Sequence, residues 1–357
     1  MNICLKNLKK LMIIFFFMLI LVFLVIIFNK DGGKNELSVC NWGNFISDGS
    51  NENPDVNNLF KMETGISVDY QTFQTNEELF AKMISGSANY DVITCSDYMI
   101  SKLIENNMLN ELNFDNISNI NLIRKDFLNL GFDPESKYSV PYIWGLIGIF
   151  YNKKAVLEKE INWNILWNEK YEKQILMFDN PRDAFGISLL RSGSSINSSE
   201  EKDWTNAAKE LSNQNKLVQT YGMDQILDKL INEEALIAPY YSGDASYLLS
   251  MNPNLGFKIP ESGTIMFIDS LCIPKNSKHK LEAEKYINFL CRTDIALMNA
   301  KYIEYCSPQI EVYKKLYNPI SYLNENERKK SQIFLNLNSK ISEIIDNSWI
   351  EIKVGIK

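Results

Sequence analysis

The sequence predicts an α/β fold of two lobes with a ligand cleft between them, preceded by an N-terminal transmembrane helix. Three observations lead to this fold class. The chain has 357 residues, which is more than one compact lobe usually needs. Strand-like and helix-like segments alternate along it, as they do in mostly parallel sheets. Aromatic and acidic residues follow several strands, and open α/β sheets bind ligands at these strand ends.

Residues 1–28 are predicted to be the membrane segment. Their apolar run, 11–28, has 18 residues and no charge, close to the ~20 that cross a bilayer. Three lysines precede the run, so we expect a single-pass anchor with the body outside the cell membrane and 29–36 as linker. A cleavable signal peptide is the alternative, although its apolar region would be shorter, ~7–15 residues. Lipidation is disfavoured because the nearest downstream cysteine, Cys40, lies in a predicted strand.

The first part of the body alternates strand and helix. Gly65 follows a helical pattern at 56–64 and is a typical C-cap residue. The expected strands here are 36–40, 66–70, 90–94, 138–142 and 146–151, and the expected helices are 56–64, 76–85 and 99–106.

The second part continues the same alternation. The apolar spacing in 281–292 is typical of an amphipathic helix. The expected strands are 175–178, 235–241, 257–260 and 270–273, and the expected helices are 164–171, 184–193, 204–213, 223–234, 244–250, 281–292 and 327–347.

Composition narrows the functional classes. The formal net charge is −7, which disfavours nucleic acid as a partner and is compatible with a cationic ligand. His279 is the single histidine, so a Ser-His-Asp triad or a multi-histidine metal site is not expected. The six cysteines form no CxxC pair and are expected to be buried thiols. Dinucleotide, P-loop, zinc-protease and nucleophile-elbow motifs are also missing, so we expect a binding protein without cofactor or metal.

Rings and carboxylates cluster next to the ends of the predicted strands. Such a set suits a thin methylene chain that carries several ammonium groups. Aromatic faces can enclose the methylenes and attract the cations. A carboxylate can pair with each ammonium group, which would be costly to desolvate alone. The segments concerned are Asn41–Phe45, Ser96–Tyr98, Phe178–Asp183, Pro239–Asp244, Phe267–Ser270 and Tyr305.

Several of these segments resemble the spermidine/putrescine-binding proteins of polyamine ABC importers, a bacterial extracellular solute-binding family. The likeness runs from about Leu37 to Tyr305. It is carried by Asn41-Trp42, Glu63–Ile66, Tyr90–Val92, Ser139–Gly145, Asp269–Pro274 and Asn288–Arg292.

The resemblance implies a periplasmic-binding-protein-like (type II) fold in which two lobes, joined by a hinge, close on a polyamine in the interlobe cleft. It also implies delivery to a membrane permease driven by a cytoplasmic ATPase, with a monomeric soluble body. On this reading the first lobe comprises 37–141 and 269–313, and the second comprises 142–268 and 314–357.

The resemblance also carries over ten site residues, each at a matching position. Phe45, Tyr241 and Phe267 replace other aromatic residues of the family and keep a ring. Asn180 stands where the family's spermidine binders have an acid, so a diamine becomes a possible cargo. The ten residues are Trp42, Phe45, Ser96, Tyr98, Asn180, Asp183, Tyr241, Phe267, Asp269 and Tyr305.

Three alternatives stay open. The same fold could bind another cargo, such as iron through Tyr240 and Tyr241 or a different organic cation. The chain could be a membrane-anchored sensory domain that needs no permease. Acid–base chemistry by Asp179 and Asp183 is a weaker alternative, because acids are common at helix starts. For the binding site we expect pairing with ammonium groups to hold the pKa values of Asp183 and Asp269 below ~4.

Overall fold

The computed structural model describes residues 36–316 and 325–355. The predicted membrane segment 1–28, and all of the linker except Glu36, lie outside these residues. Among the residues that are described, no helix has both the length and the apolar character needed to cross a bilayer.

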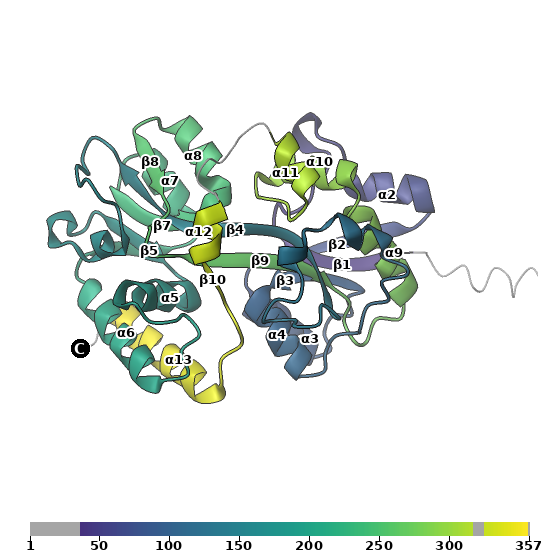
Figure 1. The fold of residues 1–357 in the computed structure, drawn as a ribbon, viewed down its shortest axis with the longest axis horizontal. Helices are drawn as coiled ribbons and strands as arrows, with labels where there is room; N and C mark the ends of the chain where they lie inside the picture. Colours follow the sequence, from purple (N-terminus) through teal and green to yellow (C-terminus); the bar gives the residue numbers. More distant parts are fainter. Residues whose placement is uncertain (1–35, 317–324, 356–357) are drawn as a thin grey trace, which may run out of the picture.

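Ten strands form a single sheet that runs through both lobes (Figure 1). Its main order is β2-β1-β3-β9-β4-β7-β5-β6, with β10 on β9 and β8 on β4. The strands are β1 (Glu36–Trp42), β2 (Ser67–Phe73), β3 (Val92–Ser96), β4 (Ser139–Asn152), β5 (Ile175–Phe178), β6 (Val218–Gly222), β7 (Ile237–Tyr241), β8 (Leu255–Lys258), β9 (Ile265–Cys272) and β10 (Gln332–Ile333).

The first lobe is built on three parallel strands, with β1 between β2 and β3. Local signals define its helices. Asp55 accepts a hydrogen bond from the Asn58 backbone, and Gly65 ends the same helix with φ 74°, a conformation that glycine adopts without strain. The Thr75 side chain caps the next helix in the same way as Asp55. The helices are α2 (Val56–Thr64), α3 (Asn76–Ile84), α4 (Asp97–Glu105), α9 (Lys280–Leu290), α10 (Thr293–Ile303) and α11 (Ile310–Lys315).

The second lobe surrounds β5, β6 and β7. Asn180 caps α5, which is buried along most of its length, and Pro181 occupies its first turn. The C-terminal helix α13 packs on α5 and α6, although both helices are far from α13 in the sequence (Figure 1). The helices are α5 (Pro181–Ser192), α6 (Glu201–Gln214), α7 (Gln225–Ile231), α8 (Ala245–Met251), α12 (Glu325–Lys330) and α13 (Ser339–Val354).

Two strands, β4 and β9, connect the lobes (Figure 1). β4 pairs with β9 from Ser139 to Leu146 and with β7 from Ile147 to Tyr151. β9 pairs on its other side with β3 of the first lobe. The ladder between β4 and β9 shifts register between Pro141 and Ile143, where proline has no N–H to donate. The predicted lobe boundaries at 141/142 and 268/269 fall inside these strands and stay a prediction.

Large side chains pack against the shared strands because two glycines leave room for them. A Cβ atom at Gly145 would lie 2.5 Å from the Phe267 ring, and one at Gly148 would lie 2.3 Å from the Phe257 ring. The five described cysteines are free and buried.

Most predicted elements are present, with shifted ends, but three regions differ. The helix expected at 327–347 is wrong: this stretch contains α12, β10 and the start of α13, because Asn338 accepts a hydrogen bond from the Ile341 backbone and starts a new helix there. The helix expected at 164–171 is two 3₁₀ turns, each capped by an asparagine. The strands expected at 138–142 and 146–151 are one strand, β4. Outside 327–347, β6, α10 and α11 are absent from the sequence-based prediction, and within that stretch β10 is absent from it as well.

Gly148→Ala should destabilise the protein by about 1–3 kcal/mol, the usual cost of overpacking a core. The added methyl group meets the Phe257 ring, which is 6% exposed and has little room to move. Urea unfolding measures the effect. Gly43→Ala is the control, because nothing lies within 4 Å of a Cβ there. Equal midpoints for the two variants would contradict the packing argument.

Candidate functional site

One carboxylate oxygen joins the carboxyl ends of β1 and β3 to β9. Asp269 is 3% exposed, and its Oδ1 accepts a hydrogen bond from Trp42 Nε1 at 3.2 Å and from Ser96 Oγ at 2.8 Å. Ser96 and Asp269 are directly paired in the antiparallel ladder. The structure therefore brings together three of the predicted site residues.

Five rings continue from this point as a chain of contacts, which we call the aromatic belt. Its members come from both lobes and from the connecting strand β9. Successive ring centroids lie 6.4 Å apart for Trp42 and Phe45, 5.8 Å for Phe45 and Tyr305, 5.8 Å for Tyr305 and Phe267, and 5.3 Å for Phe267 and Tyr241. All five side chains are partly buried, so each keeps some surface that a ligand could contact.

A second buried carboxylate lies at the other end of the belt. Tyr241 donates its hydroxyl hydrogen to Asp183 Oδ2 at 2.6 Å. Asp183 is in the first turn of α5, where a negative charge is favourable to the helix. Asp269 and Asp183 thus bond to the first and the last ring of the belt.

Asn180 has a local role in the structure. Its Oδ1 accepts hydrogen bonds from the backbone of Arg182 at 2.9 Å and of Asp183 at 3.4 Å. The side chain therefore orients the helix turn that carries Asp183, and it adds no charge. An acid at this position would add a negative charge beside Asp183.

Tyr98 lies beside the belt. Its hydroxyl accepts from Asn76 Nδ2 at 3.0 Å and donates to Glu77 Oε1 at 3.0 Å. Its ring packs edge to face against the Phe334 ring, with the two ring centroids 6.5 Å apart. Sequence reasoning missed Asn76 and Glu77, although they begin the helix directly after β2 and the strand-end criterion covers them.

Asp244 is a further acid beside the belt that the sequence-based list left out. Tyr305 donates its hydroxyl hydrogen to Asp244 Oδ2 at 2.7 Å. The segment Pro239–Asp244 had been recognised as a strand end rich in rings and acids, so the signal was available. Position alone did not show that its last residue reaches Tyr305, which is 61 residues away along the chain.

Burial dominates the electrostatics of these acids, although the charge of Arg182 also acts on Asp183 and lowers its pKa. Burial raises the pKa of Asp183, of Asp244 and of Asp269 to about 6 in each case, and the hydrogen bonds from Tyr241, Tyr305, Ser96 and Trp42 offset only part of the effect. No lysine or arginine among the described residues forms an ion pair with any of the three. The expectation of pKa values below ~4 concerns acids that are paired with ammonium groups, so it stays a prediction for the ligand-bound protein.

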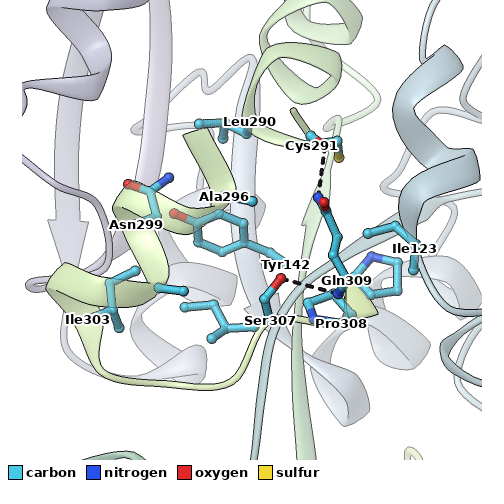
Figure 2. Close-up of a pocket in the computed structure, with 13 residues that line it drawn as sticks. Ile123, Tyr142, Leu290, Cys291, Ala296, Asn299, Ile303, Ser307, Pro308 and Gln309 are labelled. Carbon is cyan, nitrogen blue, oxygen red and sulfur yellow. Dashed lines mark hydrogen bonds between the residues drawn. The ribbon is translucent and has the colours of Figure 1, made fainter. Parts of the chain in front are cut away.

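A small pocket lies apart from the belt, and none of the predicted site residues lines it (Figure 2). Two of its residues support the loop that carries Phe45. Tyr142 donates its hydroxyl hydrogen to the Phe45 carbonyl at 2.9 Å, and Asn299 Oδ1 accepts from the Ser47 backbone at 3.0 Å. The pocket also contacts the register shift in β4, through Pro141, Tyr142 and Ile143.

Asp269→Asn should stabilise the ligand-free protein at pH 8 by about 1–3 kcal/mol. Both donors bond to Oδ1, so an amide oxygen keeps both bonds while the uncompensated charge is removed. A raised pKa means that protonation stabilises the native state at low pH and that this contribution is lost as the pH rises through about 6. The gain should therefore shrink as the pH falls below about 6 and should vanish only below ~3.9, the pKa of an aspartate in the unfolded chain.

Thermal unfolding at several pH values measures this gain. The matched control is Asp115→Asn, at an exposed aspartate. A variant that is less stable than the parent at pH 8 would refute the assignment of an uncompensated charge to Asp269.

Comparisons with known proteins agree with this geometry. Residues 87–330 match a family described as bacterial extracellular solute-binding protein, and residues 5–129 match one described as hypothetical lipoprotein (MG045 family). The chain is 32% identical over 287 residues to the spermidine/putrescine-binding periplasmic protein of Escherichia coli, covering 80% of each protein. It is 26% identical over 345 residues to the E. coli putrescine-binding periplasmic protein PotF, covering 89% of this chain and 91% of PotF.

Solved structures show the same likeness. The crystal structure of the spermidine/putrescine ABC transporter substrate-binding protein PotD from Streptococcus pneumoniae, in complex with calcium and HEPES, is 30% identical. It superposes with a TM-score of 0.77 over 90% of this chain and 99% of that chain. The two-lobe fold is therefore confirmed. The chain belongs to the bacterial extracellular solute-binding proteins, the family that includes the spermidine/putrescine-binding periplasmic proteins, and it is a binding protein and not an enzyme.

Proposed function

We propose that this protein is the substrate-binding subunit of an ABC importer and that it captures a polyamine at the aromatic belt. The relatives named for spermidine and putrescine support the cargo, and their transport role supports a permease and an ATPase as partners. The ten carried-over residues are proposed as the binding site, with Tyr98 beside the belt and Asn180 in a supporting position.

The observation that carries this proposal is the pair of buried carboxylates at the two ends of the belt. Asp269 bonds to Trp42, and Asp183 bonds to Tyr241. Neither forms an ion pair with a cation in the described part of the chain. Each is buried, so ionisation is costly until an opposite charge arrives. A ligand with an ammonium group near each end would supply that charge.

The rings between the acids suit the rest of such a ligand. Aromatic faces bury methylene groups and attract cations at the same time. Because the belt includes residues of both predicted lobes, a ligand bound along it would hold the lobes together. Hinge closure on the ligand is the motion we propose.

We propose further that the body is tethered outside the cell membrane. The support is the apolar run 11–28 in the sequence and the similarity of residues 5–129 to a hypothetical lipoprotein family. A tether would keep the monomeric body close to its permease. Both candidate tethers, an uncleaved helix and a lipid, place the body on the same side of the membrane.

Another organic cation is the second candidate cargo. Buried carboxylates and rings recognise an ammonium group without regard to the rest of the molecule, and Asn180 is uncharged where an acid is expected in spermidine binders. A panel that includes monoamines and guanidinium compounds separates this candidate from a polyamine. Iron is less favoured, because the Tyr241 hydroxyl already donates to Asp183.

Calorimetry of residues 36–357 with putrescine, spermidine and spermine tests the proposed function. We expect binding by the parent protein and a loss of about 2–5 kcal/mol in Asp269→Asn and in Asp183→Asn, because a desolvated ammonium loses its partner. The matched control is Asp179→Asn, in the same loop, since Asp179 is half-exposed and pairs with Lys353 at 2.7 Å. Absence of binding by the parent up to millimolar ligand would rule the function out.

Affinity should also depend on pH with a defined sign. The cation binds the ionised acids, and burial raises the pKa of Asp183 and of Asp269 to about 6 in the free protein. Affinity should therefore be constant above about pH 7 and fall below pH 6, by up to about tenfold per pH unit for each acid that must ionise. Titrations at pH 8, 6 and 5 measure this trend. Affinity that stays level down to pH 5 would argue against carboxylate recognition.

A further inference from the structure

Asp97, the first residue after β3, has a side chain that no ligand can reach, because it is 0% exposed. Its two oxygens each accept one backbone hydrogen bond. Oδ1 accepts from Tyr98 at 2.7 Å, and Oδ2 accepts from Ile268 at 3.3 Å. Tyr98 is a predicted site residue, and Ile268 lies between two others, Phe267 and Asp269. One buried side chain therefore holds the backbone of two separate parts of the site.

The Asp97 side chain extends the ladder between β3 and β9 by one step. The last pair of this ladder is Ser96 and Asp269, so the next pair would be Asp97 and Ile268. The backbone turns into α4 at Asp97. On the other side of β9, Trp144 is opposite Ile268 but donates its own backbone N–H to the segment after α10. The Asp97 carboxylate thus replaces the strand carbonyl that β3 no longer supplies.

The same carboxylate starts α4. Ser96 is at the N-cap of this helix but makes no capping hydrogen bond, and its hydroxyl hydrogen goes to Asp269. Backbone N–H groups in the first turn have no partner inside a helix. Asp97 accepts the N–H of Tyr98, so it performs part of the capping task. Ser96 is consequently left to orient Asp269.

We propose that Asp97 is a positioning residue of the binding site, which fixes the Tyr98 ring relative to the Phe267 ring and the Asp269 carboxylate. This inference rests on the proposed function. Without Asp97, the N–H of Ile268 would be buried with no acceptor, which is costly. The chain would then shift to satisfy this donor, and Phe267 and Asp269 would move with it.

Two substitutions separate the hydrogen bonds of Asp97 from its charge. Asp97→Asn and Asp97→Ala both remove the carboxylate. The amide oxygen in Asp97→Asn can still accept from Tyr98, but the amide nitrogen cannot accept from Ile268. Asp97→Ala keeps neither bond. Amide hydrogen exchange followed by NMR should therefore become faster at Ile268 in both variants, and at Tyr98 only in Asp97→Ala. Unchanged exchange at Ile268 would contradict the proposal.

Calorimetry of residues 36–357 with putrescine and spermidine measures the effect on binding. Asp97→Asn should lower the affinity for both ligands by the same factor, about tenfold, because the misplaced Asp269 bonds an ammonium group that both ligands have. Asp97→Ala should lower both affinities further.

The matched control is Asp91→Asn, at the other end of β3. Asp91 is also buried, and its two oxygens accept from the Ser38 backbone at 3.1 Å and from Ser277 Oγ at 2.7 Å. Neither donor is near a predicted site residue in the sequence. Asp91→Asn should therefore lower the stability of the protein and keep the parent affinities.

The outcomes separate the two proposals. If the parent binds neither polyamine, the proposed function fails and this inference fails with it. If the parent binds both and the Asp97 variants bind as tightly, only the inference fails. Equal losses in Asp97→Asn and Asp97→Ala would also overturn it, because the missing charge would then explain them. An equal loss in Asp91→Asn would do the same, because general destabilisation would be sufficient.

A measurement on the parent protein needs no variant, so a folding defect cannot obscure it. A polyamine that contacts Tyr98, Phe267 and Asp269 should restrain the backbone that Asp97 joins. Its binding should therefore slow amide exchange at Tyr98 and Ile268 more than at Ser38, the backbone partner of Asp91. Equal slowing at all three amides would contradict the positioning role.

Discussion

Asp269 Oδ1 accepts hydrogen bonds from Ser96 and Trp42, and through them this one atom ties the ends of two first-lobe strands to a strand shared by both lobes. Because Asp269 is on β9, any ligand that contacts it acts directly on the connection between the lobes. Trp42 then starts the ring contacts that lead to Tyr241 and Asp183. The position of the whole belt therefore depends on how β9 holds this carboxylate.

The buried acids of this site lower the folding stability of the ligand-free protein. Asp183 and Asp269 are buried and Asp244 is half-buried beside the rings, and among the described residues none of the three has an ion-pair partner. Arg182 acts on Asp183 through its charge alone, and each acid has a hydrogen-bond donor. A core of the same volume without charges would hold the lobes together better. Binding proteins accept this cost because the same acids become favourable once the ligand supplies positive charge. The hydroxyl and indole donors keep the carboxylates in place until then.

Local patterns predicted much of the fold and most of the site. The helix at 56–64 has its predicted bounds, since Asp55 and Gly65 are cap residues recognisable from sequence. Rings and acids near strand ends pointed to the belt. Trp42 and Tyr241 end β1 and β7, whereas Phe267 and Asp269 lie inside β9, which is antiparallel to β3 and β4. The prediction of one helix at 327–347 was wrong, because Asn338 starts a new helix and β10 forms only through pairing with β9. Asp244, Asn76 and Glu77 were missed as site residues for a similar reason: their partners are side chains distant in sequence.

The pocket of Figure 2 lies against the irregular point of a strand that both lobes share. Pro141 and Ile143 flank the register shift, and both line the empty space. Packing is therefore incomplete beside an irregular point of this shared strand. A movement that fills this space carries a negative volume change. Hydrostatic pressure would favour the lobe arrangement in which this pocket is smaller. The packing inside one lobe would then influence how the two lobes are oriented.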